Sequence, residues 1–198
     1  MAGVRQFDES EAFDKALALF WRQGYARTTM QELAQETGVQ RGSLYHAYGD
    51  KEALFLKVFE VYRDRYVGQM REALNHSDLE TAVRDFFNFA ISSMTTGNPS
   101  RGCLSTKTAV GTEDMNQSVR AVIEEMLNEI ERALHERFTR ADAKSRLTTS
   151  PRKAARMIVA MTRGLVVLER VYQDEKRLRE MADLVIGLLM LPGRNGSP

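Results

Sequence analysis

Donor-bearing side chains are concentrated in one short run, RGSLYHAYGDK, from Arg41 to Lys51. Arginine, tyrosine, histidine and lysine donate hydrogen bonds to phosphate oxygens, while glycine and serine let a backbone come close to a bound molecule. Side chains such as those of Gln40 and Arg41 also reach base edges in a DNA groove. This combination is what docking on DNA requires. The alternative is that Tyr45 and Tyr48 are core aromatics and that the rest is a solvated surface.

Cys103 is the only cysteine, and it follows a glycine in NPSRGCLSTKTAV. We expect a helix to begin here, so that the helix dipole and Arg101 favour the thiolate and Lys107 lies one turn further on. Such a thiol is a candidate sensor of electrophiles or oxidants; the alternative is an inert, partly buried cysteine. One cysteine forms neither an internal disulfide nor a cysteine-based zinc site, which agrees with a reducing compartment.

The positions around the first run have the spacing of two short helices joined by a tight turn. Thr29 and Glu32 have the form of a capping box, and Gly38 permits the turn. Leu44 anchors the second helix ten positions after Ala34, which is small enough for a close helix crossing. This is the spacing of a helix-turn-helix, and a helix of about eight residues, roughly 12 Å long, suits a major groove about 12 Å wide.

Apolar residues recur three and four positions apart over most of the chain, and sustained alternation of period two is absent. The prolines, at positions 99, 151, 192 and 198, leave long stretches free to be helical. The sequence therefore predicts an all-α protein of about nine helices. The expected ranges are about 10–23, 29–38, 40–48, 50–74, 79–96, 102–110, 114–141, 151–173 and 176–190.

Composition excludes several classes of protein. The chain of 198 residues is 43% hydrophobic and 28% charged, holds no apolar run of about 18 residues, and begins without the apolar region of a secretory signal. We therefore expect a cytoplasmic protein. A net charge of +1 gives no support of its own to nucleic-acid binding. The histidines, at 46, 76 and 135, are scattered, and neither an HExxH motif nor a glycine-rich phosphate loop occurs, so we expect no metal, no cofactor and no enzyme activity.

The run FDKALALFWRQGYARTTMQELAQETGVQRGSLYHAYGDKEALF resembles the DNA-binding domain of TetR-family transcriptional regulators, over about residues 5–60. The shared pattern joins a helix ending in Phe-x-x-x-Gly-Tyr to Thr-Thr, a helix-turn-helix and a Leu-Tyr-x-x-Phe-x-x-Lys segment. Two positions depart from it: Tyr48 stands where phenylalanine is usual, and Ala47 stands where many members carry a second aromatic residue or a histidine. The resemblance implies DNA contacts through Thr29, Gln40, Arg41, Gly42, Ser43, Tyr45, His46 and Lys51. Residues 40–43 would face the groove, and the others would hold the phosphate backbone.

The resemblance also implies a homodimer that reads palindromic double-stranded operator DNA, with residues 1–50 as the helix-turn-helix domain and residues 51–198 as the ligand-binding and dimerisation domain. Members of the family join through their last two helices. Ala160 and Gly164 permit close helix approach here. Apolar surface comes from Leu165, Leu168, Val185, Leu188 and Leu189. The alternative is that this face packs only within one chain.

An effector pocket is expected in the middle of the larger domain, because methionine and aromatic side chains adapt to apolar ligands. Its candidate residues are Phe59, Tyr62, Tyr66, Phe86, Phe89, Met94, Met126 and Met161. The alternative for each of them is plain core. The Gly-Cys-Leu element with a nearby lysine is similar to that of TetR-type repressors that respond to electrophiles and oxidants, which again marks Cys103 and Lys107.

We therefore expect a one-component transcriptional regulator, a repressor released from operator DNA by a small apolar or electrophilic effector or by thiol modification. The sequence itself shows neither the direction of regulation nor the effector. The alternatives are an all-α enzyme and a helical adaptor that has lost DNA binding.

Overall fold

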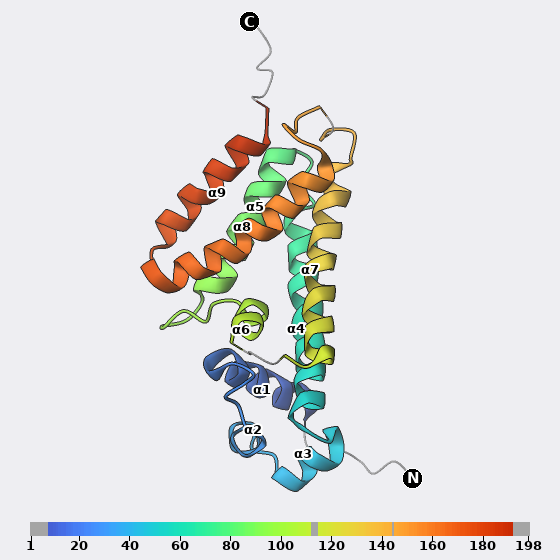
Figure 1. Cartoon of the computed structure of the whole chain (residues 1–198), viewed down its shortest axis with the longest axis vertical. Coiled ribbons are helices and arrows are strands. Elements are labelled where there is room, and N and C mark those ends of the chain that lie inside the picture. The colour runs from blue at the N-terminus through green and yellow to red at the C-terminus, as the bar shows by residue number, and fades with distance from the viewer. Residues whose placement is uncertain (1–7, 112–114, 144, 192–198) are drawn as a thin grey trace, which may run out of the picture. The chain divides into compact units, whose positions relative to one another are not determined.

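The computed structural model describes residues 8–111, 115–143 and 145–191. Within these ranges the regular elements are nine α-helices (Figure 1), and an isolated β-bridge joins Leu147 to Met190. The helices are α1 (Glu9–Gln23), α2 (Met30–Thr37), α3 (Arg41–Tyr48), α4 (Lys51–Ala73), α5 (Leu79–Thr95), α6 (Leu104–Val110), α7 (Gln117–Phe138), α8 (Pro151–Tyr172) and α9 (Glu175–Leu189). The all-α prediction is confirmed, and most boundaries lie within a few residues of those expected. The expected helix start at 114 lies outside the described residues.

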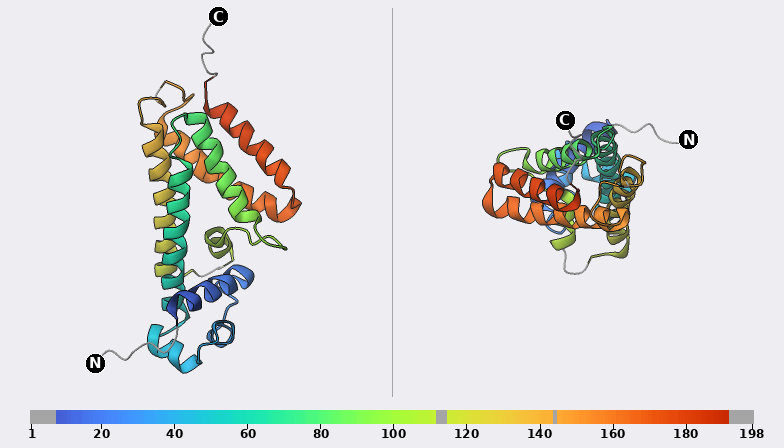
Figure 2. Two further views of the ribbon diagram at one scale, coloured as in Figure 1. Left: turned by 180° about the vertical axis from the view of Figure 1, so that it is seen from behind. Right: turned by 90° about the horizontal axis from the view of Figure 1, so that it is seen from above.

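The chain folds into two compact units, each built from two stretches of sequence. Unit 1 combines the residues up to Arg65 with Cys103–Glu124, and unit 2 combines Tyr66–Gly102 with the residues from Glu125 onward. The long helices α4 and α7, continuous in Figure 2, therefore contribute residues to both units. The functional division at residue 50 stays a prediction, because a unit defined by packing need not coincide with a functional domain.

Unit 1 begins with a capped helix whose apolar face is buried. The carboxylate of Asp8 accepts hydrogen bonds from the backbone N–H groups of Ser10 at 2.9 Å and Glu11 at 3.2 Å, which fixes the start of α1. Helix α1 packs on α2 and α6, and α2 packs on α3. Phe20 of α1 and Phe55 of α4 are fully buried and meet edge to face, with 5.0 Å between ring centroids. This contact ties α1 to the first half of α4.

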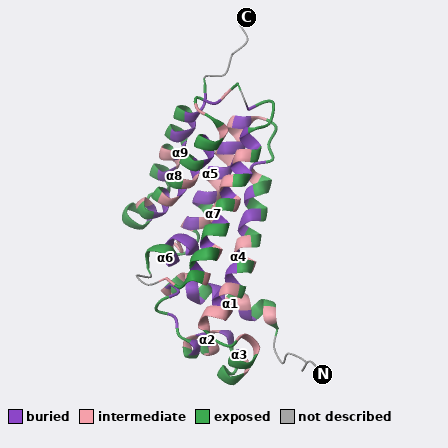
Figure 3. Ribbon diagram, turned by 45° about the vertical axis from the view of Figure 1, so that its right-hand side comes forward, coloured by how far each residue is buried: buried purple, intermediate pink, exposed green. Residues whose placement is uncertain are grey.

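Unit 2 is a helical bundle in which α5, α8 and α9 pack on one another. The carboxylate of Asp78 caps α5 by accepting from the backbone N–H of Thr81 at 2.9 Å. Hydrogen bonds from Thr81 and from Arg146 lower the pKa of Asp78. Most helices carry both buried and exposed residues within their turns (Figure 3), as amphipathic packing requires. None of the helices among the described residues is long and apolar enough to cross a membrane.

Candidate nucleic-acid interface

A capping box fixes the start of α2. The Oγ1 atom of Thr29 accepts from the backbone N–H of Glu32 at 3.3 Å, and a carboxylate oxygen of Glu32 accepts from the backbone N–H of Thr29 at 2.8 Å. The Thr29 hydroxyl also donates to that carboxylate at 2.8 Å. Hydrogen bonds from the side chain and the backbone of Thr29 lower the pKa of Glu32. The predicted capping box is confirmed, and it leaves Thr29 exposed at the N-terminus of the helix.

A tight turn joins α2 to α3. Gly38 adopts the left-handed conformation, with φ 72° and ψ 9°, which side chains other than hydrogen disfavour. The hydroxyl of Thr37 donates to the carbonyl oxygen of Leu33 at 2.7 Å and accepts from the N–H of Val39 at 3.3 Å. Val39 and Leu44 are buried, so they form the interior of the corner and hold α3 against α2. The two short helices joined by a tight turn, which the spacing predicts, are therefore present in the structure.

Helix α3 presents polar side chains to solvent. Gln40, at the N-cap, Arg41 and Gly42 are exposed, and Ser43 is half-buried. The guanidinium of Arg41 lies over the ring of Tyr45, 5.3 Å from its centroid, and Nη2 of Arg41 lies 3.4 Å from the tyrosine hydroxyl. Tyr45 is 41% exposed, which excludes the alternative that it is a core aromatic. These two side chains are therefore held together on the exposed side of α3.

The last turn of α3 is tied to the start of α1. The Tyr48 hydroxyl donates to Oε1 of Glu9 at 2.9 Å, and the Tyr48 ring lies 5.7 Å from the ring of Phe13. Tyr48 is half-buried, and its hydroxyl, which a phenylalanine lacks, adds a link between the two helices. His46 is exposed, whereas Ala47 is half-buried and offers only a methyl group. The C-terminal half of α3 thus combines an outward histidine with an inward anchor.

Lys51 connects the start of α4 to the loop that follows α1. Its ammonium donates to the carbonyl oxygens of Tyr25 at 3.1 Å and Ala26 at 3.4 Å, and it lies 4.5 Å from the centroid of the Tyr25 ring. Desolvation by burial lowers the pKa of Lys51. An ammonium has three donors, so a phosphate contact by Lys51 would use the donor that the two carbonyls leave.

Unit 1 brings together all the residues for which the family resemblance implies a DNA contact. They are Thr29, Gln40, Arg41, Gly42, Ser43, Tyr45, His46 and Lys51. Each is exposed or half-buried, and the first turns of α2, α3 and α4 carry most of them. Their contacts with DNA stay predictions.

Cys103 stands at the N-cap of α6, as expected, and is only 7% exposed. Its sulfur lies 3.1 Å from the hydroxyl oxygen of Ser105 and 4.0 Å from that of Tyr62. The ammonium of Lys107 donates to the carbonyl oxygen of Trp21, in the last turn of α1. Sequence spacing placed Lys107 beside the thiol, but it gave no sign of this contact with a residue 86 positions away.

The residues expected to line an effector pocket fall in both compact units. Phe59 and Tyr62 belong to unit 1, where their rings meet edge to face at 5.5 Å. Those in unit 2 are Tyr66, Phe86, Phe89, Met94, Met126 and Met161. Phe89 and Met161 are half-buried, and the other six are buried. The choice between pocket and plain core stays open.

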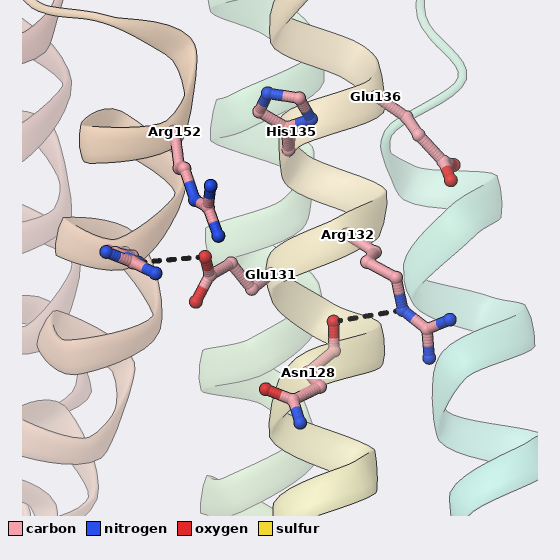
Figure 4. Close-up of a pocket in the computed structure, with 7 residues that line it drawn as sticks. Asn128, Glu131, Arg132, His135, Glu136 and Arg152 are labelled. Carbon is pink, nitrogen blue, oxygen red and sulfur yellow. Dashed lines mark hydrogen bonds and ion pairs between the residues drawn. The ribbon is translucent and has the colours of Figure 1, made fainter.

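Unit 2 carries a polar groove of about 380 Å³ along α7 and α8 (Figure 4). Its lining residues are Asn128, Glu131, Arg132, His135, Glu136, Arg152 and Arg156. Glu131 accepts from Nε of Arg156 at 3.0 Å, and the Arg152 guanidinium points toward the same carboxylate in Figure 4. Because charged side chains form most of this lining, the groove does not match the apolar pocket expected for an effector.

A stripe of exposed apolar residues runs along α8 and continues on α9. Its members on α8 are Met157, Ala160, Gly164, Val167 and Val171. Successive members are three or four positions apart, so they share one face of the helix. On α9, which packs on α8, Leu184 and Leu188 are 68% and 71% exposed. Exposed apolar faces are common at protein interaction surfaces, and we call this one the α8–α9 stripe.

The residues expected at a dimer interface divide into two groups. Exposed in the stripe are Ala160, Gly164 and Leu188, and Leu168 is half-buried. Buried within unit 2 are Leu165, Val185 and Leu189, at 0%, 6% and 2% exposed. This second group packs in the core of its own chain, because it lies on the faces that α5, α8 and α9 turn toward one another. Met157, Val167 and Val171 were missed by the sequence reasoning. The signal for them was the helical spacing of positions 157, 160, 164, 167 and 171.

Comparison with known proteins supports the same architecture. The family model described as bacterial regulatory proteins, tetR family, matches residues 12–58, and the one described as tetracyclin repressor-like, C-terminal domain, matches residues 79–185. The HTH-type transcriptional regulator YezE of Bacillus subtilis is 24% identical over 96% of this chain and 100% of its own. The transcriptional repressor ComR of Escherichia coli is 33% identical over 49% of this chain, and that match spans 47% of ComR.

Solved structures share the fold over almost the whole chain. Reduced NemR of E. coli superposes with a TM-score of 0.83 at 17% identity, covering 93% of this chain and 97% of NemR. A cysteine mutant of the TetR-family regulator CifR, complexed with operator DNA, gives a TM-score of 0.84 at 24% identity, covering 93% of this chain and 98% of CifR. The two family matches together cover both the helix-turn-helix and the C-terminal bundle. The chain therefore belongs to the TetR family of DNA-binding transcriptional regulators, which are not enzymes.

Proposed function

We propose that two copies of the chain bind a palindromic operator duplex, with one α3 in the major groove of each half-site, and repress transcription until an effector releases them. The observation that carries this proposal is the exposed start of α3 on a rigid corner. Arg41 and Tyr45 lie against each other on the outside, while Leu44 is 1% exposed on the inside. CifR, which has the same fold, forms a complex with a 26-bp double-strand operator.

The contacts follow from the position of each side chain on unit 1. Gln40, Arg41 and Ser43 read bases, because they lie at the N-cap and in the first turn of α3, where the short helix enters the groove. Tyr45 binds a phosphate through its exposed hydroxyl group, and Thr29 does so when its exposed hydroxyl donates to a phosphate instead of to the Glu32 carboxylate. The remaining contributors are Gly42, His46 and Lys51, which let the backbone approach and add donors to the flanking phosphates.

The α8–α9 stripe supports a homodimer. Ala160 and Gly164 let two helices approach closely, and Val167 and Leu188 supply apolar area. A dimer built this way reads two half-sites about 34–36 Å apart, one turn of DNA. Since the proposed partner is operator DNA, we place the protein in the cytoplasm.

Release requires an effector that prefers a dimer geometry in which the two α3 helices no longer fit the operator. ComR and KstR2 are named repressors, whereas FasR is named an activator, and we propose repression for this chain because ComR matches over the longest stretch of the three. The effector is a small apolar or electrophilic molecule, or a reagent that modifies Cys103. Burial of that thiol favours an apolar electrophile over a charged oxidant.

A binding assay with selected DNA tests the proposal. Duplexes selected from a random library by the wild-type protein, and DNA upstream of its own gene, serve as labelled probes in gel shifts. Arg41→Ala is expected to change base preference, whereas Tyr45→Ala is expected to weaken binding to all DNA sequences about equally. An Arg41→Ala protein with unchanged affinity and preference would contradict the placement of α3 in the groove. Failure of the wild-type protein to select any duplex would instead favour an adaptor that has lost DNA binding.

A further inference from the structure

Helix α6 is joined to α1 by a lysine side chain. Lys107 of α6 donates from its ammonium to the carbonyl oxygen of Trp21, and both residues belong to unit 1. The aliphatic part of the same side chain lies over Gly24, where a β-carbon would be 3.8 Å from both Cγ and Cδ of Lys107. Lys107 therefore covers the C-terminal end of α1 with both its methylene groups and its charge.

The carbonyl that Lys107 binds lies in the last turn of α1. The N–H of Gly24 returns to the carbonyl oxygen of Phe20 at 2.8 Å, and Gly24 then turns the chain out of the helix with φ 83° and ψ 160°. The carbonyl group of Trp21 is the next one in that last turn. It lies at the C-terminal end of the helix, where the helix dipole has its negative end. An ammonium at this position stabilises the helix end by hydrogen bonding and by charge.

The loop that follows α1 leads directly to the proposed phosphate contact at Thr29. Within it, the hydroxyl of Thr28 is buried and donates to the carbonyl oxygen of Gly24 at 2.7 Å. On the other side, Lys51 donates to the carbonyl oxygens of Tyr25 and Ala26. Residues 21–28 are thus held by two lysines, one from α6 and one from α4, immediately before the capping box begins α2.

We propose that Lys107 is a positioning residue for DNA binding: by capping α1 it sets the position of the loop and of Thr29, without touching DNA itself. The inference rests on the proposed phosphate contact of Thr29. Through this cap, α6 contributes indirectly to operator affinity in the absence of any effector. The cap also gives Lys107 a role that differs from the activation of the neighbouring thiol.

Operator affinity and its salt dependence together test this role. Lys107→Met keeps the length of the stem and removes the ammonium, whereas Lys107→Arg keeps a donor and a charge. Each full-length variant is titrated against a labelled duplex selected from a random library by the wild-type protein.

We expect Lys107→Met to bind about fivefold more weakly, the ratio that corresponds to about 1 kcal/mol for one hydrogen bond, and Lys107→Arg to restore most of the affinity. Lys57→Met, which removes an exposed, ion-paired charge elsewhere in unit 1, is the matched control and is expected to bind like the wild type.

Salt dependence separates positioning from contact. The logarithm of the affinity falls with the logarithm of the salt concentration, and each phosphate contact makes this slope steeper by about 0.9. Lys107→Met should therefore keep the wild-type slope while its affinity falls. A slope reduced by about one would show that Lys107 touches phosphate and would overturn the proposal. Equal affinity of Lys107→Met and wild type would overturn it as well, even if the variant melts at a lower temperature, because the side chain would then only stabilise the fold. If the wild-type protein selects no duplex, the proposed function itself fails.

Discussion

Replacing Leu188 by glutamate tests the α8–α9 stripe as a dimer interface. Leu188 is 71% exposed in the single chain, so a partner copy would remove most of its side chain from water. Full burial of a leucine contributes about 1.5–3 kcal/mol, and burial of this exposed fraction therefore contributes about 1–2 kcal/mol. In a two-fold symmetric dimer the residue occurs once in each copy. The loss of apolar burial at the interface is therefore doubled, to about 2–4 kcal/mol. The loss of this apolar burial alone should raise the dimer dissociation constant about 30- to 1000-fold. Burial of two carboxylates would raise it further.

Sedimentation velocity over a concentration series measures this dissociation constant directly. The matched control is Val110→Glu, since Val110 is 79% exposed but lies on α6, outside the stripe. We expect the control to dimerise like the wild type and circular dichroism to show the same helix content in all three proteins. A Leu188→Glu protein with the wild-type dissociation constant would refute the assignment of the stripe. An equal loss in the Val110→Glu protein would show that surface charge, not the stripe, decides association.

Three further predictions address other parts of the chain. Tyr48→Phe removes only the hydroxyl that donates to Glu9 and should lower the free energy of unfolding in urea by about 1 kcal/mol, but by nothing in a Glu9→Ala background. The pKa of Asp78 is lowered in the folded state, so its carboxylate stabilises the fold above the unfolded-state pKa and loses that effect as pH falls through the folded pKa. The melting temperature of Asp78→Asn should therefore fall less on acidification than that of the wild type. Melting temperatures that fall equally with pH in the two proteins would contradict this. Cys103→Ser should keep operator DNA bound when N-ethylmaleimide releases it from the wild type; release that persists rules out the thiol as the switch.

Local signals explain why the helices and the corner were predictable from the sequence. Gly24 and Gly38 end α1 and α2, Thr29 begins α2, and Pro151 begins α8. Each of these residues acts on the backbone within a few positions of itself, so its effect is visible in a linear reading. The residues predicted to contact DNA all lie in unit 1 for the same reason, because a helix-turn-helix is a local motif.

Long-range packing explains what the sequence did not show. The contact between Lys107 and Trp21 joins residues 86 positions apart, and no periodicity encodes it. The faces of α8 posed a second difficulty, because apolar residues line both its buried and its exposed sides. Leu165 and Val167 are equally apolar, yet the first is fully buried and the second is 55% exposed. Only the arrangement of α5 and α9 around α8 decides which of them is buried.

Unit 1 is encoded in two separate parts of the gene, and this limits how the protein can be recombined. A chimera that takes residues 1–65 as a portable DNA-reading module leaves α6 and the start of α7 behind. It loses the Lys107 cap on α1 and the hydrogen bonds that Asn116 and Ser118 donate to Glu52 at the start of α4. A transferable cassette would have to include residues 103–124 as a second insert. Exchanging C-terminal halves between relatives at residue 65 would therefore separate unit 1 from part of its own packing.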